Sequence, residues 1–260
     1  MTEEGQPQLT ILVPTRNEAK NVEPLLMRLS ATVAQGTVAL FVDDSDDDTP
    51  RVIQAARERG FGSLDTRLLH RSGPQRTGGL GGAVLAGLET TDTQWVCVMD
   101  GDLQHPPEVV PQLLDAAHAN EADLVVASRY VAGGRNEGLG AVRTAVSWGS
   151  TVLAKVVFPY RLREIRDPMS GFFLFRREAL TATMTPRGFK ILLEIAVRHP
   201  DLVRCEVPFV FVERMAGASK GTMREGFRFL RLLAEMRWSL WQRQPAPIQE
   251  SGEQESHLVV

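Results

Sequence analysis

Short apolar runs alternate with amphipathic segments over the first half of the chain, and this alternation limits the possible fold most strongly. The apolar runs predict buried strands at Leu9–Pro14, Val38–Val42, Leu64–Leu69, Trp95–Asp100 and Asp123–Ser128. Segments with one apolar face or helix-entry residues predict helices at Glu18–Val33, Thr49–Arg59, Leu80–Leu88 and Glu108–Ala119. Such an order indicates an α/β fold with a mostly parallel sheet and helices on both faces.

The order is less regular after residue 130. Helical patterns cover Gly140–Phe158, Lys190–Arg198 and Arg224–Gln242, and apolar runs predict strands at Phe172–Phe175 and Val203–Val212, the second interrupted by Pro208. We expect one domain over residues 1–222, an amphipathic helix over 223–243 and a disordered polar tail over 244–260.

Charge is divided unevenly along the chain. Residues 1–128 carry 9 Lys and Arg against 19 Asp and Glu, whereas residues 129–243 carry 20 against 10. This asymmetry favours a cation site in the first part and an anionic partner for the second, although chance clustering of solvated charges is the alternative. The basic residues lack interleaved aromatic positions outside the last helical segment, which argues against a nucleic-acid partner.

The cysteines and the apolar runs bear on the cellular compartment. Cys97 and Cys205 each lie in an apolar run without a second cysteine nearby, which predicts buried free thiols in a reducing cytoplasm rather than a zinc site. The first five residues are polar and acidic, unlike a signal peptide. No apolar run approaches the roughly 20 residues that a membrane-spanning helix needs. We expect a cytoplasmic protein with, at most, peripheral contact at the inner face of the membrane.

Polar residues follow several predicted strands, and Asp100-Gly-Asp102 is the most informative group. Ligand sites in parallel sheets lie at the carboxyl ends of the strands. Two carboxylates one residue apart can hold one Mg²⁺ that keeps positions for phosphate oxygens, and Gln104 would add a neutral oxygen. A solvated turn is the alternative. A phosphatase with an aspartate nucleophile usually carries such a pair at its first strand, whereas this pair lies near residue 100. Gly79-Leu-Gly-Gly-Ala83 lacks the GxGxxG spacing and does not follow the first strand, which argues against a dinucleotide site.

A second acidic cluster follows the strand Val38–Val42. We expect Asp44 to accept hydrogen bonds from a base or ribose. Asp46, Asp47 and Asp48 instead favour the start of the next helix, where carboxylates cap backbone N–H groups.

These motifs together resemble a known family. They are Val13-Pro-Thr-Arg-Asn-Glu18, Val42-Asp-Asp44, Gly79-Leu-Gly81, Asp100-Gly-Asp-Leu-Gln-His-Pro-Pro107, Ser128-Arg129, Asp167-Pro-Met-Ser-Gly-Phe172 and Phe189-Lys-Ile-Leu-Leu-Glu194. Over about residues 9–222 the chain looks like the polyprenol-phosphate (dolichol-phosphate) mannosyltransferases of glycosyltransferase family 2. The resemblance implies a GT-A fold, a GDP-mannose donor, Mg²⁺ or Mn²⁺, a polyprenyl phosphate acceptor and inversion at the anomeric carbon.

The resemblance also implies roles for single residues. The metal ligands would be Asp100, Asp102 and Gln104, and the donor side would include Pro14, Arg16, Glu18, Asp44, Arg214 and Lys220. The acceptor phosphate would be held by Arg129 and Arg143, and Ser147 shares the helical face of Arg143 one turn later. Asp102, Arg129 and Arg143 are the residues expected to be catalytic.

Two departures from the family pattern stand out. Many relatives carry a lysine before Gly-Leu-Gly, where this chain has Arg76-Thr-Gly-Gly79, so Arg76 is the candidate substitute. Many relatives also have membrane-spanning helices that this chain lacks, which suggests a separate membrane-anchoring partner.

The acceptor chemistry fits the lack of an evident general base. A phosphate monoester is largely dianionic at neutral pH and is already a nucleophile. His105 precedes Pro106-Pro107, and we expect it to be structural. We expect Asp167 to orient an arginine or its own loop, with a role as a distant base as the alternative. The helices over 140–158 and 224–242, with Trp148, Trp238 and Trp241, are candidates for the membrane surface, and packing on the protein is the alternative.

Two rival functions remain. The same fold could use UDP-glucose or another nucleotide sugar with undecaprenyl phosphate. The chain could instead be a catalytically silent membrane-surface binding protein, although such a protein has no need of the metal carboxylates.

Overall fold

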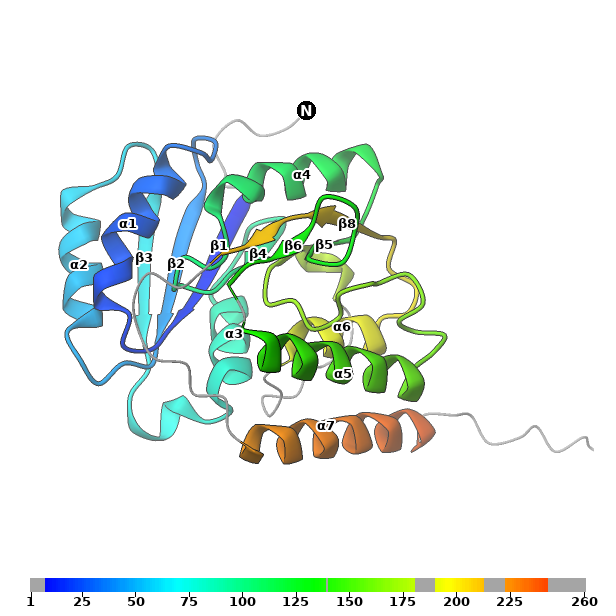
Figure 1. The fold of residues 1–260 in the computed structure, drawn as a ribbon. Helices are drawn as coiled ribbons and strands as arrows, with labels where there is room; N and C mark the ends of the chain where they lie inside the picture. The colour runs from blue at the N-terminus through cyan, green and yellow to red at the C-terminus, as the bar shows by residue number, and fades with distance from the viewer. Residues whose placement is uncertain (1–7, 139, 181–189, 213–222, 243–260) are drawn as a thin grey trace, which may run out of the picture. The chain divides into compact units, whose positions relative to one another are not determined.

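Seven strands form the central sheet of the computed structural model, which describes residues 8–138, 140–180, 190–212 and 223–242 (Figure 1). The strand order is β3-β2-β1-β4-β7-β5-β8. The strands are β1 (Leu9–Thr15), β2 (Val38–Asp43), β3 (Asp65–His70), β4 (Trp95–Val98), β5 (Leu124–Ser128), β7 (Phe173–Arg176) and β8 (Arg204–Pro208). The chain divides into two compact units, Met1–Gly221 and Thr222–Val260, and the sheet belongs to the first.

The strand directions place most carboxyl ends at one edge of this sheet. β1 pairs in parallel with β2 and with β4, β2 pairs in parallel with β3, and β5 pairs in parallel with β8. β7 runs antiparallel to both β4 and β5, so β4 and β5 point the same way. The predicted mostly parallel sheet is confirmed, and the polar residues after β1, β2, β3, β4 and β5 gather at this carboxyl edge.

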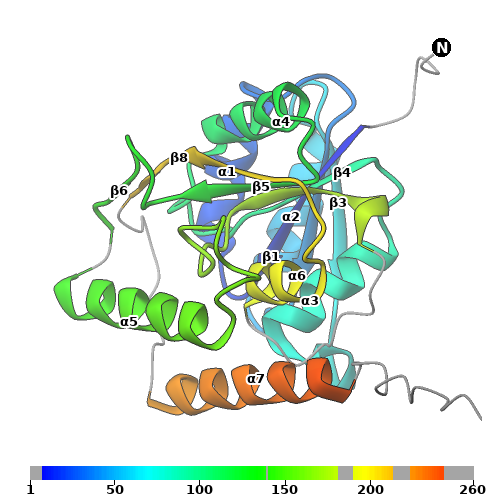
Figure 2. The same cartoon turned by 90° about the vertical axis from the view of Figure 1, so that its right-hand side faces the viewer.

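Helices cover both faces of the sheet (Figures 1 and 2). The helices of the first unit are α1 (Ala19–Ser30), α2 (Thr49–Arg59), α3 (Gly79–Glu89), α4 (Val110–Ala119), α5 (Ala141–Val157) and α6 (Ile191–Arg198), with short 3₁₀ turns η1 (Gly73–Arg76), η2 (Pro107–Val109) and η3 (Arg177–Ala179). The apolar faces of α1, α2 and α4 pack on one side of the sheet, around Ile11, Phe41 and Trp95. α3 packs on the other side, and α6 lies on the same side as α3 in both views.

The contact between α3 and the sheet depends on a missing side chain. A Cβ atom on Gly87 would lie 2.6 Å from Leu12 Cδ1 and 2.9 Å from Val42 Cγ2. The helix therefore approaches β1 and β2 more closely than any residue with a side chain would allow.

A small second sheet was not predicted. The expected strand Val203–Val212 divides after Pro208: β8 joins the main sheet, and β9 (Val210–Phe211) pairs in parallel with β6 (Arg135–Asn136). Between them, the Phe209 N–H donates to the Ser128 carbonyl at 3.2 Å. β9 is thereby directed over the end of β5.

The cysteines are free, as expected, but they differ in burial. Cys97 is fully buried in β4, and burial raises the pKa of its thiol. Cys205 is only partly buried, so the expectation of two buried thiols was wrong for this residue, which lies on the edge strand β8.

The described part of the second unit is one helix, α7 (Met223–Gln242). Arg231 pairs with Glu235 one turn later at 2.7 Å, and the rings of Trp238 and Trp241 lie 5.4 Å apart. Among the described residues of both units, no helix is long and apolar enough to cross a membrane.

Candidate active site

The Asp100–His105 turn leaves β4 at the carboxyl edge and carries the predicted metal ligands. Gly101 allows it to pack against the end of β1, because a Cβ atom there would lie 2.9 Å from Thr15 Cγ2. The Asp100 side chain is 42% exposed, whereas Asp102 is only 4% exposed. One carboxylate therefore faces solvent and the other lies within the turn.

The backbone of this turn is held in an uncommon conformation. Leu103 has φ +63°, in the left-handed region that a bulky residue rarely adopts and that costs about 1–3 kcal/mol. The Gln104 N–H donates to Asp102 Oδ1 at 3.1 Å across this residue. The surrounding contacts must stabilise the turn against this strain.

Gln104 is fixed by the chain that follows β9. Its Nε2 donates to the Val212 carbonyl at 3.1 Å, and the Val212 N–H donates to the Gln104 carbonyl at 3.3 Å. Because Nε2 is the donor, Oε1 remains the acceptor atom. Two carboxylates and one amide oxygen are a chemically suitable partial ligand set for Mg²⁺ or Mn²⁺, whose other positions phosphates and water fill. In the described parts of the chain no group of three or more His, Cys, Asp or Glu could hold a metal.

The end of β2 is tied to its neighbours through a buried carboxylate. Asp43 accepts hydrogen bonds from Thr15 Oγ1 at 2.9 Å, from Ser45 Oγ at 2.5 Å and from His70 Nδ1 at 2.8 Å. These donors follow or end β1, β2 and β3. Asp43 thus aligns the three strand ends, while the adjacent Asp44 points to a different partner.

Asp44 forms a buried bidentate ion pair with Arg71. Arg71 Nε donates to Oδ1 at 2.8 Å and Nη2 donates to Oδ2 at 2.6 Å, with the two side chains 6% and 10% exposed. Arg71 Nη2 also donates to the Gly79 carbonyl at 3.1 Å, at the start of α3. The predicted nucleoside-binding carboxylate is therefore linked to the Gly-rich loop.

Arg76, the candidate substitute for the missing lysine, is held within the protein. Its guanidinium donates to Asp46 Oδ1 at 2.5 Å, to the Ser45 carbonyl at 2.6 Å and to the Arg71 carbonyl at 2.9 Å. It fastens η1 to the end of β2. The hydrogen bond to Arg76 lowers the pKa of Asp46, whose expected capping role was wrong because this carboxylate faces η1 instead.

The helix-capping expectation holds for a single member of the acidic cluster. Asp47 Oδ1 accepts from the Thr49 N–H at 2.9 Å and from Thr49 Oγ1 at 2.5 Å at the start of α2. Asp48 occupies the N-cap position but makes no side-chain cap bond, and its carboxylate contacts Arg51 at 3.3 Å.

The remaining donor-side residues lie around the end of β1. Pro14 and Glu18 are half-buried, and Arg16 is exposed. The Glu18 N–H donates to Thr49 Oγ1 at 3.0 Å, which joins this loop to α2. Arg214 and Lys220 lie outside the described residues.

Arg129, at the end of β5, is held by a fully buried carboxylate. Its Nε and Nη2 donate to Asp167 Oδ2 and Oδ1 at 2.7 and 2.8 Å, and its backbone N–H donates to Oδ2 at 3.1 Å. Burial opposes the charge on Arg129, but the hydrogen bonds and charge of Asp167 outweigh it and raise the pKa of the guanidinium. The expectation that Asp167 orients an arginine is confirmed.

The other predicted acceptor residues lie on α5. Ser147 Oγ is 3.5 Å from Arg129 Nη2, so the helix contacts the guanidinium at this point. Arg143 lies one turn earlier and is exposed. The structure brings Ser147 to Arg129 and records no direct contact between the two arginines.

An aromatic cluster joins the two halves of the site. The cluster consists of His105, Phe172, Phe209 and Phe211. Phe211 lies 5.7 Å from the His105 ring and 5.7 Å from Arg129 Cζ, in cation–π distance. The Ser170-Gly-Phe172 loop approaches the turn closely at Gly171, where a Cβ atom would lie 3.2 Å from Asp100 Oδ2.

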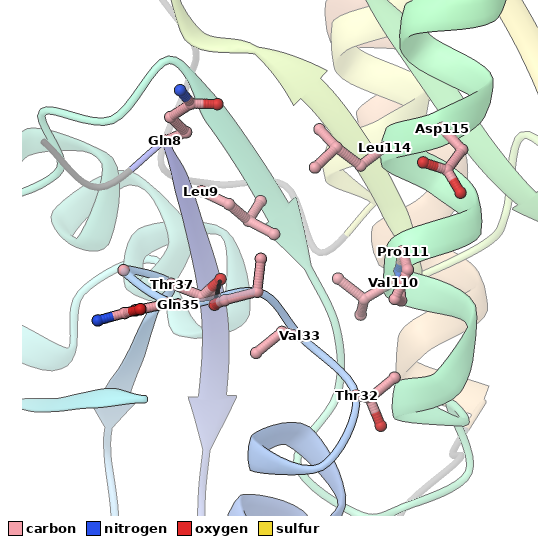
Figure 3. A pocket seen from close by; sticks show the side chains of 12 residues that line it. Gln8, Leu9, Thr32, Val33, Gln35, Thr37, Val110, Pro111, Leu114 and Asp115 are labelled. Atoms are coloured by element: carbon pink, nitrogen blue, oxygen red, sulfur yellow. Dashed lines mark hydrogen bonds between the residues drawn. The ribbon is translucent and has the colours of Figure 1, made fainter. Parts of the chain in front are cut away.

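A separate cavity of about 480 Å³ opens at the opposite, amino-terminal edge of the sheet (Figure 3). Leu9, Val33, Val110 and Leu114 contribute its apolar wall, and among the described residues Asp115 is the one charged residue that lines it. Without a cation to meet phosphate, this cavity does not match a nucleotide diphosphate.

The sequence signals missed Arg71, the partner of Asp44, and His70, a partner of Asp43. Arg71 and His70 end or follow β3, in the same strand-end position that singled out Asp44 and Asp100. Applying that criterion to basic residues would have found them. The choice of Asp44 as the partner of Arg71 depends on the pairing of β2 with β3.

The mostly parallel sheet, with a carboxylate-bearing turn and anchored arginines at its carboxyl edge, has the GT-A fold of glycosyltransferases. The family model described as "Glycosyl transferase family 2" matches residues 10–183. The chain therefore belongs to this family of glycosyltransferases.

Its relatives include dolichol-phosphate mannosyltransferases. That of Pyrococcus furiosus is 35% identical over 89% of this chain, which spans 64% of the relative's length; that of Saccharomyces cerevisiae is 32% identical, with 88% and 86% covered. An undecaprenyl-phosphate mannosyltransferase of Micrococcus luteus is 31% identical over 80% of this chain and 85% of its own. Glucosyl-3-phosphoglycerate synthase of Mycobacterium tuberculosis, solved with Mn²⁺ and UDP, has the same fold, with a TM-score of 0.66, 21% identity and coverage of 90% and 79%.

Proposed function

We propose that this chain is an inverting glycosyltransferase that moves mannose from GDP-mannose to a polyprenyl phosphate, with a divalent cation. The observation that carries the proposal is the adjacency of two charge systems: the Asp100–His105 turn and the anchored Arg129 contact the same Phe211 ring. The names of the relatives, which include dolichol-phosphate and undecaprenyl-phosphate mannosyltransferases, support mannose and a polyprenyl phosphate.

The donor would lie along the carboxyl edge, from β2 to the Asp100–His105 turn. Asp44, with Arg71 beside it, offers acceptors and donors to the nucleoside, together with Pro14 and Glu18. Asp100, Asp102 and Gln104 would hold Mg²⁺ or Mn²⁺, which would neutralise the charge that develops on the diphosphate as the sugar leaves. Arg16, Arg214 and Lys220 remain proposed donor-phosphate contacts on the basis of the family resemblance.

The acceptor phosphate would lie on the Arg129 side of Phe211. Asp167 engages Nε and Nη2 of Arg129 and leaves Nη1 without an acceptor among the described residues. That edge, with Ser147 Oγ and the exposed Arg143, offers donors to a phosphate. Because the Arg129 guanidinium is oriented before the acceptor arrives, little side-chain entropy is lost on binding.

No side chain needs to remove a proton in this reaction. A phosphate monoester is mostly dianionic at neutral pH. One of its oxygens attacks the anomeric carbon from the face opposite the diphosphate, the bond to the diphosphate oxygen breaks, and the nucleoside diphosphate leaves. The configuration is inverted, and the arginines hold the nucleophile in place.

A lipid acceptor implies contact with a membrane surface. Trp148, Val152, Val156 and Tyr160 form an exposed stripe at intervals of four residues on α5 and just beyond it, while Thr151 and Ala154 on this helix are buried. We infer that the stripe inserts peripherally at the inner face of the membrane, near Ser147 and the acceptor phosphate. The Trp238 and Trp241 pair on α7 offers a second such contact, and a membrane-anchoring protein partner would add to both.

The experiment is a donor screen. Purified protein is incubated with Mn²⁺, a short polyprenyl phosphate and radiolabelled GDP-mannose, UDP-glucose or other nucleotide sugars, and lipid-extractable label is counted. We expect label from GDP-mannose, none with a chelator, and none from the Asp102→Ala variant. Label from UDP-glucose instead would replace the donor. Label that persists with a chelator would refute the metal role, and no label from any donor would favour a silent binding protein.

A further inference from the structure

His105 lies beside the proposed metal ligands but is almost completely removed from the surface. It is only 2% exposed. Its ring stacks on Phe172 with centroids 5.1 Å apart and meets Phe209 and Phe211 edge-on. An aromatic residue would satisfy this environment, so packing alone does not require a histidine.

The polar atoms of His105 have a more specific task. The backbone N–H of Asp100 donates to His105 Nδ1 at 3.0 Å. A nitrogen that accepts a hydrogen bond carries no proton, so the ring is neutral with its proton on Nε2. The hydrogen bond joins the first and last residues of the Asp100–His105 turn and so closes the turn.

The segment that this hydrogen bond closes contains the strained residue of the turn. Leu103, at φ +63°, lies between the two residues that the hydrogen bond joins. Without the bond, the backbone could relax toward an ordinary conformation, and the carboxylates of Asp100 and Asp102 would separate. Gly171, whose absent Cβ leaves room for both the Asp100 carboxylate and the His105 ring, brings the Ser170-Gly-Phe172 loop against the closure.

We propose that His105 is a positioning residue for the metal site. Its Nδ1 accepts the hydrogen bond from the Asp100 backbone N–H and thereby holds the two carboxylates at one cation. The inference rests on the metal-dependent transfer proposed above. His105 touches neither the cation nor the substrate in this account and acts only through the backbone of the turn. Hydrogen-bonded groups behind metal ligands change metal affinity by about 10- to 100-fold when they are removed.

Two substitutions at His105 distinguish the effect of the Nδ1 hydrogen bond from the effect of imidazole packing. His105→Asn keeps an acceptor, because asparagine Oδ1 is the same number of bonds from the backbone as histidine Nδ1, but loses the ring. His105→Phe keeps the ring and its stacking but loses the acceptor. His199→Phe is the matched control, since it removes a buried histidine that bonds the Ile195 carbonyl at the end of α6.

Mn²⁺ binding is measured by electron paramagnetic resonance in the presence of GDP, and exchange of the Asp100 amide is followed by nuclear magnetic resonance in metal-free protein. If the Nδ1 hydrogen bond positions the carboxylates, His105→Phe should bind Mn²⁺ about 10- to 100-fold more weakly and exchange the Asp100 amide faster. His105→Asn and His199→Phe should match the wild type in both measurements, although His105→Asn should melt at a lower temperature.

The opposite order, with His105→Phe normal and His105→Asn weak, would show that the ring acts by packing and would overturn the proposal. Equal behaviour of the two variants, whether weak or normal, would overturn it as well. If the wild type binds no Mn²⁺ with GDP, the metal-dependent function fails. The amide exchange then decides by itself whether His105 holds the turn.

Discussion

At the residue scale, two buried ion pairs fix the charged groups at the carboxyl edge of the sheet. Arg71 holds Asp44 on the proposed donor side, and Asp167 holds Arg129 on the proposed acceptor side. In each pair both side chains are largely removed from water, so loss of one partner leaves an uncompensated charge. These pairs orient the groups that we propose to meet substrate, and they should make the site sensitive to single substitutions.

The Arg71–Asp44 pair gives the first prediction. Arg71→Met should lower the free energy of unfolding by about 3–5 kcal/mol, because the buried Asp44 carboxylate loses its partner. The variant should also bind GDP more weakly, measured by calorimetry at a temperature where it is folded. Arg59→Met, which removes an exposed partner of Glu23, should change little in urea unfolding. Equal effects of the two substitutions would contradict a buried, oriented pair.

Buried histidines give a second prediction, on pH. Burial lowers the pKa of His199 below its usual 6.5, so in acid the unfolded chain binds a proton that the folded chain does not. The free energy of unfolding should therefore fall as the pH drops from about 6.5 to 5. In His199→Phe this fall should be shallower, since one contribution is gone. Urea unfolding across this range is the measurement, and an unchanged slope would mean that His199 titrates alike in both states.

At the scale of elements, local sequence patterns predicted most strands and helices but not all of their partners. The apolar runs that begin at Leu9 and Val38 are each bounded by polar residues, so the sequence itself marks where these two buried strands begin and end. The insertion of β7 antiparallel between β4 and β5, and the pairing of β9 with β6, join segments far apart in the chain, and no local pattern encodes them.

The same limit applied to the site. Strand-end logic placed Asp44, Asp100 and Arg129 at one edge correctly, because carboxyl ends of parallel strands meet there. It did not supply Arg71 as the partner of Asp44, 27 residues away in sequence. Asp167 was expected to orient an arginine, but the sequence did not single out Arg129, 38 residues away. It also expected Asp46 to cap a helix, although Arg76 in η1 takes its carboxylate. Pair formation depends on tertiary contacts that composition and spacing leave open.

Two glycines of α3 give an element-scale prediction. A Cβ atom on Gly82 would lie 2.1 Å from the Thr77 carbonyl, whereas one on Gly87 would meet the movable ends of Leu12 and Val42. Gly82→Ala should displace the loop that Arg71 and Arg76 hold and should weaken GDP binding. Gly87→Ala should lower stability by about 1–3 kcal/mol through overpacking and leave GDP affinity unchanged. Calorimetry and urea unfolding distinguish them, and identical GDP affinities would argue against a donor role for the loop.

At the scale of the whole molecule, the distribution of charge and exposed apolar area is consistent with the proposed reaction between a hydrophilic donor and a lipid acceptor. The acidic first part carries the Asp100–His105 turn, and the basic part carries Arg129, Arg143 and the exposed stripe on α5. A hydrophilic donor and a lipid acceptor would thus approach from differently charged regions. The residues of α7 repeat the combination of tryptophans and arginines in the second unit.

The stripe yields a prediction on membrane binding. Val156 is 70% exposed, so Val156→Asp should leave the fold intact while weakening binding to vesicles that contain anionic lipid, measured by co-sedimentation. Met27→Asp places the same charge on a residue of α1 that is 62% exposed and should bind vesicles like the wild type. Deleting residues 223–260 should also release protein. Unchanged binding by Val156→Asp would exclude the stripe as a lipid contact.

The central claim is that the acceptor is a phosphate held by oriented arginines. The direct measurement is transfer of labelled mannose from GDP-mannose to a polyprenyl phosphate and, in parallel, to the polyprenol of the same length. The account predicts label on the phosphate alone, with loss of transfer in Arg129→Met, because the alcohol needs a base that this site does not use. Comparable transfer to the free alcohol would contradict it.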